Sequence, residues 1–260
     1  MQIIRATELK NYSLTSGLEH ALQKVPFQDE VFFAVREGEV SGIGVRWINS
    51  FHPTAKYVRL IGDFPVAYLT HHIVPQDKVI YACWEDDQVI PVLIEEGFQL
   101  FRKTYMKIFS IKCLLTQLEH VDVPSYVQSL QEVLNEEPEI FFTILKINYE
   151  ATHLANPVVA LTWKEWQGHL LIDSPDLTLS AISKGGYILL HSISTTDYEI
   201  GWLGGTDLQS LLKWQLTKLQ QQGVKRIRIE ADTTDWYAMA LFSFFNFDKI
   251  KAWHAYMKRV

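Results

Sequence analysis

The sequence predicts an α/β fold made of two αβ units in tandem. Runs typical of strands alternate with runs typical of helices, and the same order of elements occurs once in each half of the 260 residues. The boundary falls near residues 109–112, so we expect one unit over residues 1–110 and a second over residues 111–260. Matching residues recur at an offset of 148 or 149 positions: Gly38 with Gly186, Asp86 with Asp235, Gly97 with Asn246, and Phe98 with Phe247.

In the first half, apolar and β-branched runs predict strands, and turn residues separate them. Residues 36–39 form a turn signal between two of these strands. Pro91 lies in the first turn of the last predicted helix, and Gly97 ends it. In chain order we expect a strand at 3–4, a helix at 14–25, strands at 31–35, 40–47 and 56–61, a helix at 65–74, a strand at 78–84 and a helix at 88–96.

The second half repeats this order around a leucine-rich helix. Thr206 or Asp207 can cap that helix, and Gly223 can end it. Its apolar stripe has helical spacing and consists of Leu208, Leu211, Leu212, Leu216 and Leu219. In chain order we expect strands at 177–183, 187–193 and 198–203, a helix at 207–222, a strand at 224–231, a helix at 235–245 and a strand at 250–257.

The two halves differ in the spacing around this helix. Positions 57 to 86 are 29 apart and positions 198 to 235 are 37 apart, so the helix of the first unit should be about two turns shorter. The acidic stretch 119–150 lies between the repeats. Within it, Pro124 and Pro138 bracket a short helical pattern, which predicts a solvated helix and a connector.

Composition and charge exclude several classes of protein. The chain is 48% hydrophobic and 21% charged, as expected for a folded globular protein. The 24 Lys and Arg residues against 30 Asp and Glu residues give a net charge of −6, which argues against a nucleic-acid partner. No apolar run approaches the roughly 18 residues that span a bilayer, so no membrane partner is expected. The N-terminus lacks the apolar stretch of a secretory signal, and a cytoplasmic location is expected.

Cysteine and histidine positions predict no metal site. Two cysteines exclude a disulfide framework and a four-cysteine zinc site. His71 and His72 are adjacent, so on a helix their side chains point in different directions. His191 alternates with apolar residues in a predicted strand, which indicates a hydrogen-bonded core histidine rather than a catalytic one.

The second half resembles the GNAT superfamily of acyl-CoA-dependent N-acetyltransferases. The resemblance covers most of residues 111–260 and is weaker in the first half. The stretch 232–247 is similar to the family's Asn-x-x-Ala…Tyr-x-x-x-Gly-Phe signature, with Asp235 at the Asn, Ala238 at the Ala, Phe242 at the Tyr, Asn246 at the Gly and Phe247 at the Phe. The resemblance to the family also rests on residues 149–157, 163–166, 199–202, 208–223 and 226–230. It implies that each unit is a twisted, mostly antiparallel sheet flanked by helices.

The same resemblance implies acetyl-CoA as the co-substrate. The family holds its pyrophosphate with a Gln/Arg-x-x-Gly-x-Gly/Ala loop at the start of the long helix, where backbone N–H groups and the helix dipole favour an anion. Here the stretch is 202–208, the glycine motif is missing, and Asp207 places negative charge there. Gly204 and Gly205, within this stretch, form either a tight turn or a shortened phosphate loop. We expect the cofactor between strands 198–203 and 225–231, held by Leu203, Gly204, Gly205, Thr206, Asp235 and Phe242.

The catalytic groups implied by the resemblance are partly replaced. Many family members use a Tyr to protonate the leaving thiolate, and Phe242 cannot do this. Glu199 is the candidate general base, and an exposed strand residue is its alternative interpretation. The basic run Lys213, Lys218, Lys225, Arg226 and Arg228 either meets CoA phosphates or lies on solvated faces.

Two functions therefore compete. The first is an acetyl-CoA-dependent N-acyltransferase acting on a small-molecule or protein amine, as a monomer or homodimer. The second is a non-catalytic binding or scaffold protein that keeps the fold and has lost acetyl-CoA chemistry. The altered loop and Phe242 motivate the second, and the resemblance of residues 199–247 motivates the first.

Overall fold

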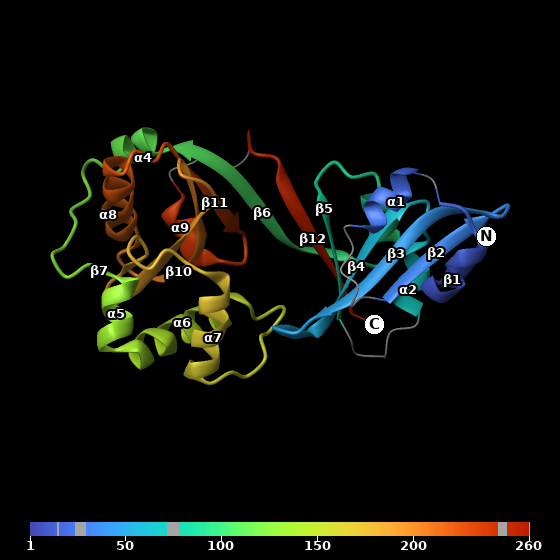
Figure 1. Cartoon of the computed structure of the whole chain (residues 1–260), viewed down its shortest axis with the longest axis horizontal. Helices are drawn as coiled ribbons and strands as arrows, with labels where there is room; N and C mark the ends of the chain where they lie inside the picture. The colour runs from blue at the N-terminus through green and yellow to red at the C-terminus, as the bar shows by residue number, and fades with distance from the viewer. Residues whose placement is uncertain (15, 24–29, 72–77, 244–248, 260) are drawn as a thin grey trace. The chain divides into compact units, whose positions relative to one another are not determined.

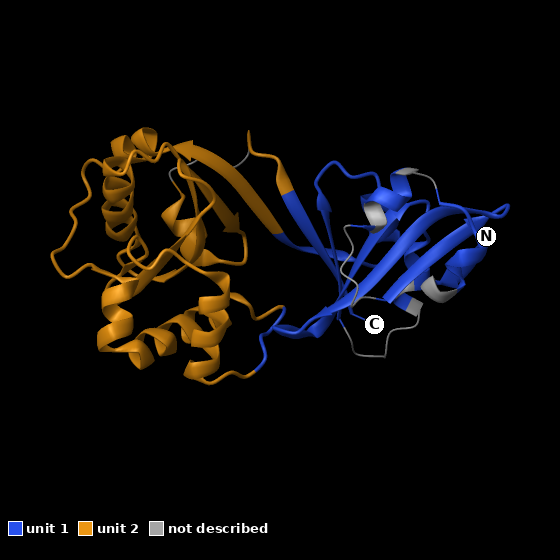
Figure 2. Cartoon of the chain, viewed as in Figure 1, with its two compact units in different colours: residues 1–102, 156–159, 253–260 blue, residues 103–155, 160–252 orange. Residues whose placement is uncertain are grey.

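The chain forms a mixed α/β fold with two compact units. The structure, a computed structural model, describes residues 1–14, 16–23, 30–71, 78–243 and 249–259 (Figure 1). Unit 1 consists of residues 1–102, 156–159 and 253–260, and unit 2 consists of residues 103–155 and 160–252 (Figure 2). The boundary thus lies eight residues before the expected position at 110, and the C-terminal strand belongs with unit 1.

Unit 1 is a sheet in which one strand pair is parallel and the others are antiparallel. Val79, Tyr81, Phe98 and their neighbours form a core beneath it, and a second core lies around Phe33 and Ile43. Its strands are, in sheet order, β1 (Gln2–Arg5), β2 (Glu30–Arg36), β3 (Glu39–Asn49), β4 (His52–Gly62), β5 (Lys78–Trp84) and β12 (Ala252–Arg259), with β4 and β5 parallel. Its helices are η1 (Ala6–Asn11), α1 (Ser16–Leu22), α2 (Val66–His71) and α3 (Ile90–Glu95).

The strands of unit 2 have an arrangement of the same kind. Its strands are, in sheet order, β6 (Gln99–Ser110), β11 (Arg226–Asp232), β10 (Asp197–Gly205), β9 (Gly186–Ser192), β8 (Ala181–Ile182) and β7 (Gln128–Ser129), with β10 and β11 parallel. Its helices are α4 (Ile111–Gln117), α5 (Leu130–Glu136), α6 (Pro138–Thr152), α7 (Trp163–Asp173), α8 (Leu208–Gln221) and α9 (Trp236–Leu241).

The predicted leucine stripe forms the buried face of α8. All five of its leucines belong to the core of unit 2, and α8 packs beside α4 (Figure 1). Gln215 is fully buried in the same helix, and its side-chain amide donates to the carbonyl oxygens of Leu179 and Ile188 at 3.0 and 2.8 Å. These two hydrogen bonds fix α8 against the sheet, so the start of α8 is held beside the end of β10.

Each sheet is completed by a strand that follows the last helix of the other unit in the sequence. Residues 104–110 of β6, which follows α3, pair antiparallel with β11 in unit 2. Residues 253–259 of β12, which follows α9 in sequence, pair antiparallel with β5 in unit 1. The two units therefore exchange their final strands, which local sequence patterns do not reveal.

A pair of glycines makes the same close approach in both units. Gly42 lies opposite Gly62 in unit 1, and Gly186 lies opposite Gly205 in unit 2. A β-carbon on Gly42 would lie 2.4 Å from the carbonyl oxygen of Asp63, and one on Gly186 would lie 2.0 Å from that of Thr206. Gly186 therefore corresponds to Gly42, 144 positions earlier, and the expected match with Gly38 is wrong because Gly38 lies in the β2–β3 turn.

Other expected elements differ in extent. The strand expected at 177–183 is shortened to β8, and α6 and α7 lie where no long helix was expected. The repeat matches at Asn246 and Phe247 lie outside the described residues, as do His72 and the residues after α2 that would fix its full length. Across the described ranges, the structure contains no helix with the length and apolar character needed to cross a bilayer.

Candidate functional site

The candidate site lies where the two parallel strands of unit 2 separate. β10 and β11 pair only at Asp197 with Arg226, Tyr198 with Ile227, and Glu199 with Arg228. Beyond these pairs, β10 stays paired with β9 as far as Gly205, and β11 stays paired with β6 as far as Asp232. The sheet thus splits toward the carboxyl ends of its two parallel strands, the edge at which open α/β sheets bind ligands.

A β-bulge lies at the start of this split. The register of β10 against β9 shifts between Ile200 and Trp202, so Gly201 is the extra residue. Ile200 packs in the core with α8, whereas the ring of Trp202 lies 5.3 Å from that of Tyr149 in α6. The bulge therefore places Glu199 and Trp202 on the same face, away from α8.

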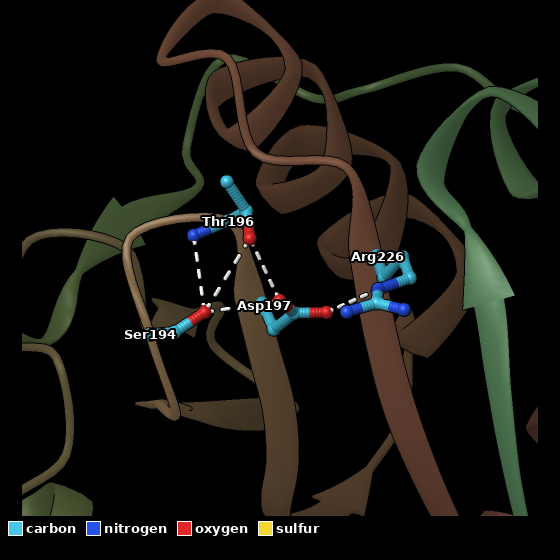
Figure 3. Close-up of polar contacts among 4 residues, drawn as sticks. All are labelled: Ser194, Thr196, Asp197 and Arg226. Carbon is cyan, nitrogen blue, oxygen red and sulfur yellow. Dashed lines mark hydrogen bonds and ion pairs between the residues drawn. The ribbon is translucent and has the colours of Figure 1, made fainter.

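Two ion pairs connect the strands at the first and last of these three paired positions. Nη1 of Arg228 lies 3.4 Å from Oε2 of Glu199, and both side chains are partly exposed. Asp197 binds Nε of Arg226 and also accepts from the hydroxyls of Ser194 and Thr196 (Figure 3). These hydrogen bonds, that from Arg226 above all, hold the pKa of Asp197 well below its usual range.

The loop from β10 to α8 is closely packed. Thr206 donates its backbone N–H to the carbonyl oxygen of Gly185 at 2.8 Å, and Gly205 has φ +87°. A β-carbon on Gly205 would lie 1.9 Å from that same oxygen, and one on Gly204 would lie 2.8 Å from the hydroxyl of Tyr187. Both glycines are therefore required by local packing, which is the geometry of a tight turn.

The first turn of α8 has backbone N–H groups that the helix itself does not use. Asp207 precedes it with φ 61°, and its carbonyl oxygen accepts from the N–H of Leu211. Within the described ranges, the N–H groups of Leu208, Gln209 and Ser210 have no acceptor. The carboxylate of Asp207 stands at the same place and accepts from the hydroxyl of Tyr126 at 3.4 Å. The helix dipole and the three N–H groups favour an anion there, and Asp207 opposes it.

Comparisons with known proteins identify the fold. No protein-family model matches the sequence, and no curated protein matches it. A GCN5-related N-acetyltransferase from Sphaerobacter thermophilus matches with TM-score 0.58 at 11% identity, over 93% of this chain and 84% of that one. A conserved protein of unknown function from Enterococcus faecalis V583, described as a probable N-acyltransferase, matches with TM-score 0.50 at 12% identity, over 100% and 72%. The chain has the GNAT fold.

The GNAT fold confirms the expected α/β fold class. The predicted site residues lie at different places in unit 2. Glu199 lies where the split begins, Gly204 and Gly205 end β10, and Thr206 follows them in the loop to α8. Leu203 packs against the α8 core instead, on the other face of β10 from Glu199. Glu199 and the glycines thus lie on one strand, at the start and end of the part of β10 that is not paired with β11, and Leu203 is turned to the other face.

The two predicted residues near α9 have structural roles. Asp235 caps α9, because its side chain accepts from the N–H groups of Tyr237 and Ala238 at 2.9 and 3.1 Å. Burial raises its pKa against the lowering effect of these two bonds. Phe242 is fully buried in the core with Leu241 and Ala238. The side chain of Phe242 is therefore not presented to solvent at the split.

The basic run is dispersed over several contacts. Lys213 donates to the carbonyl oxygens of Glu119 and Val121, and Nζ of Lys218 lies 3.7 Å above the ring of Trp214. Arg226 and Arg228 bind the acidic residues of β10 described above. Four of the five cations thus contact groups of this chain. Among the described residues, no three His, Cys, Asp or Glu side chains lie together in a way that could hold a metal ion.

Unit 1 contains a similar split between parallel strands, but its strand β4 has no acidic residue comparable to Glu199 of β10. β4 and β5 pair in parallel from Ala55 with Lys78 to Val58 with Tyr81, and β4 then continues to Gly62. The segment 156–159 covers the start of β4, because the side chain of Asn156 donates to the hydroxyl of Tyr57 at 2.6 Å and its carbonyl oxygen lies 2.8 Å from Nδ1 of His52. The candidate site is therefore the split of unit 2.

Proposed function

We propose that unit 2 is the acyl-transfer unit of an acetyl-CoA-dependent N-acyltransferase that acts on an amine. The observation that supports this most is the bulge at Gly201 placed at the start of the β10–β11 split, next to an acidic side chain. Acetyl-CoA supplies the acyl group as a thioester, and the transfer forms a C–N bond as the C–S bond breaks.

The chain's own residues would divide the work as follows. The N–H groups of Leu208, Gln209 and Ser210 hold an anionic phosphate at the start of α8, as their lack of acceptors in the described chain permits. Glu199 is partly exposed on the strand beside the bulge and receives the ammonium group of the acceptor. Catalysis then depends on positioning the amine against the thioester and on removing its proton.

The second candidate function is a binding or scaffold protein without acyl transfer. It is favoured by two observations at the loop. The N–H of Thr206 is used by Gly185, and the carboxylate of Asp207 stands where a phosphate would bind. Both weaken an anion site at the start of α8, and neither affects the split itself.

Calorimetry with Asp207→Asn decides between these functions. Asparagine tolerates the left-handed backbone of position 207 and removes the charge. We expect the wild-type chain to bind acetyl-CoA and this variant to bind about two- to fivefold tighter, as a dipole-site charge of roughly 0.3–1 kcal/mol implies. Asp122→Asn, a change at an exposed residue, is the matched control and should leave binding unchanged.

Transfer is then measured by mass spectrometry with a panel of amines. Acetylated product that depends on acetyl-CoA and falls in Glu199→Gln supports the acyltransferase. Absence of acetyl-CoA binding by both the wild type and Asp207→Asn would exclude it and leave the binding protein.

A further inference from the structure

An imidazole faces the bulge at the candidate site. His191 lies in β9 directly opposite Glu199 of β10, so the two side chains share one face with β-carbons about 5 Å apart. From the sequence we expected a hydrogen-bonded core histidine, and Nε2 does not meet that expectation. Nε2 of His191 is buried and, among the described residues, makes no hydrogen bond. The side chain is 14% exposed.

A carboxylate and a glycine lie beside different parts of this ring. Oδ2 of Asp173, at the end of α7, lies 4.0 Å from Nε2 of His191. Along the Nδ1–Cε1 edge of the ring, a β-carbon on Gly201 would lie 2.3 Å from Cε1 and 2.4 Å from Nδ1, against 3.5 Å from Nε2. Nδ1 therefore faces the bulge, where Gly201 is exposed to solvent. A carboxylate behind one ring nitrogen, with the other nitrogen facing a site, is the arrangement of an oriented general base.

We propose that His191 accepts the proton of the acceptor's ammonium group at Nδ1, with Asp173 holding Nε2–H. This rests on the acyltransfer function proposed above and assigns its proton transfer to a residue other than Glu199. Oε2 of Glu199 already accepts from Arg228, and Glu199 serves as the counter-ion that places the ammonium group. Apo distances such as the 4.0 Å here commonly shorten once substrate binds.

The protons balance in this scheme. The ammonium group has one proton more than the neutral amine that attacks the acyl carbon, and His191 takes this proton. As the C–N bond forms and the C–S bond breaks, the second proton leaves nitrogen and the thiolate takes it up. His191 then releases its proton to water, so the net products are the amide, the free thiol and one proton.

Steady-state kinetics of the full chain test the assignment. We expect His191→Gln to lower kcat by about 10²- to 10⁴-fold, to keep the acetyl-CoA affinity, and to lose the acidic limb of the kcat/KM pH profile. Glu199→Gln should mainly raise KM for the amine. His120→Gln, a change at a histidine whose side chain is 90% exposed, is the matched control.

Other charged groups on the elements around His191 could also shape this pH profile. Asp173 from α7 lies 4.0 Å from the ring, Glu199 of β10 pairs opposite His191, and Arg228 from β11 binds Glu199. Asp176, whose backbone N–H donates to the carbonyl of Leu190, has its carboxylate bound by Tyr198. If Glu199→Gln removes the acidic limb and His191→Gln retains it, Glu199 is the base and the proposal is overturned.

Nitrogen NMR of histidine-labelled protein tests the ring orientation without any turnover. We expect neutral His191 to carry its proton on Nε2, and Asp173→Asn to reduce this preference. A proton on Nδ1 overturns the proposal whatever the activity. If the wild type acetylates no amine, the proposed acyltransferase function is wrong. If His191→Gln leaves turnover unchanged, only the proposed role of His191 is wrong.

Discussion

The imidazole of His191 occupies the space that a side chain on Gly201 would need. An ideal β-carbon at Gly201 would lie 2.3 Å from Cε1 of that ring, closer than real atoms approach. The contact joins adjacent strands, because Gly201 is the bulge of β10 and His191 lies in β9. A side chain at position 201 therefore requires the ring of His191 to move.

Gly201→Ala should destabilise the chain through this contact. We expect a loss of about 1–3 kcal/mol in the free energy of unfolding, as for other overpacked sites, measured by urea titration. Combining it with His191→Ala should recover most of that loss, because the two changes are coupled. Gly168→Ala is the control: its β-carbon meets nothing within 4 Å inside α7, so a gain of roughly 0.5–1 kcal/mol is expected. Additive effects of the two β9–β10 changes would contradict the contact.

Two replacements of Asp235 should separate the stability that its helix cap contributes from the cost of burying its charge. Its folded pKa is raised by burial, so its contribution to stability is present below the unfolded pKa of about 3.9 and is lost as pH rises through the folded value. Asparagine caps helices as well as aspartate and carries no charge. At pH 7 we expect Asp235→Asn to match or exceed the wild type in urea unfolding, whereas Asp235→Ala should lose about 1 kcal/mol. Equal losses of unfolding free energy in both variants would show that burial of the Asp235 carboxylate carries no cost.

Asp197 should have the opposite pH dependence. Its hydrogen bonds with Arg226, Thr196 and Ser194 lower its folded pKa. Its contribution to the stability of the folded chain is therefore present above the unfolded pKa of about 3.9. That contribution is lost as pH falls through the lowered folded pKa. Melting temperatures measured from pH 7 down to pH 2 should fall less steeply in Asp197→Asn than in the wild type. Asp122→Asn, at an exposed position, should follow the wild type, and a wild-type slope in Asp197→Asn would contradict the pKa direction.

The sequence predicts elements whose pattern is local. The leucine spacing and Gly223 predict α8 almost to its ends, because one apolar stripe and one terminator define it. The strand expected at 177–183 is shorter because the side chain of Asp176 accepts from the N–H groups of Thr178 and Leu179 and forms a turn. The long helix α6 was missed because its buried residues Phe141, Phe142 and Leu145 follow an acidic run that indicated solvent.

The candidate site was only partly predictable for the same reason. Glu199 could be proposed because the resemblance and a strand pattern place it on the expected strand. His191 could not, because Asp173 and Gly201 approach it through a helix end and a bulge that are 18 and 10 positions away. The exchange of β6 and β12 also arises from pairing between distant segments, so the repeat alone placed the boundary at 110.

The pairing of β6 with β11 predicts which part of the chain unit 2 needs in order to fold. Seven residue pairs, from Arg226 with Ser110 to Asp232 with Thr104, join the two strands, and Phe109 is buried in the unit 2 core. A fragment of residues 111–252 loses these contacts and exposes an unpaired strand edge, which favours aggregation. A fragment of residues 103–252 retains them. We expect cooperative urea unfolding, followed by circular dichroism, for the longer fragment and its absence for the shorter one. Equal stability of the two fragments would place the boundary back at residue 110, because β6 would then contribute nothing to unit 2.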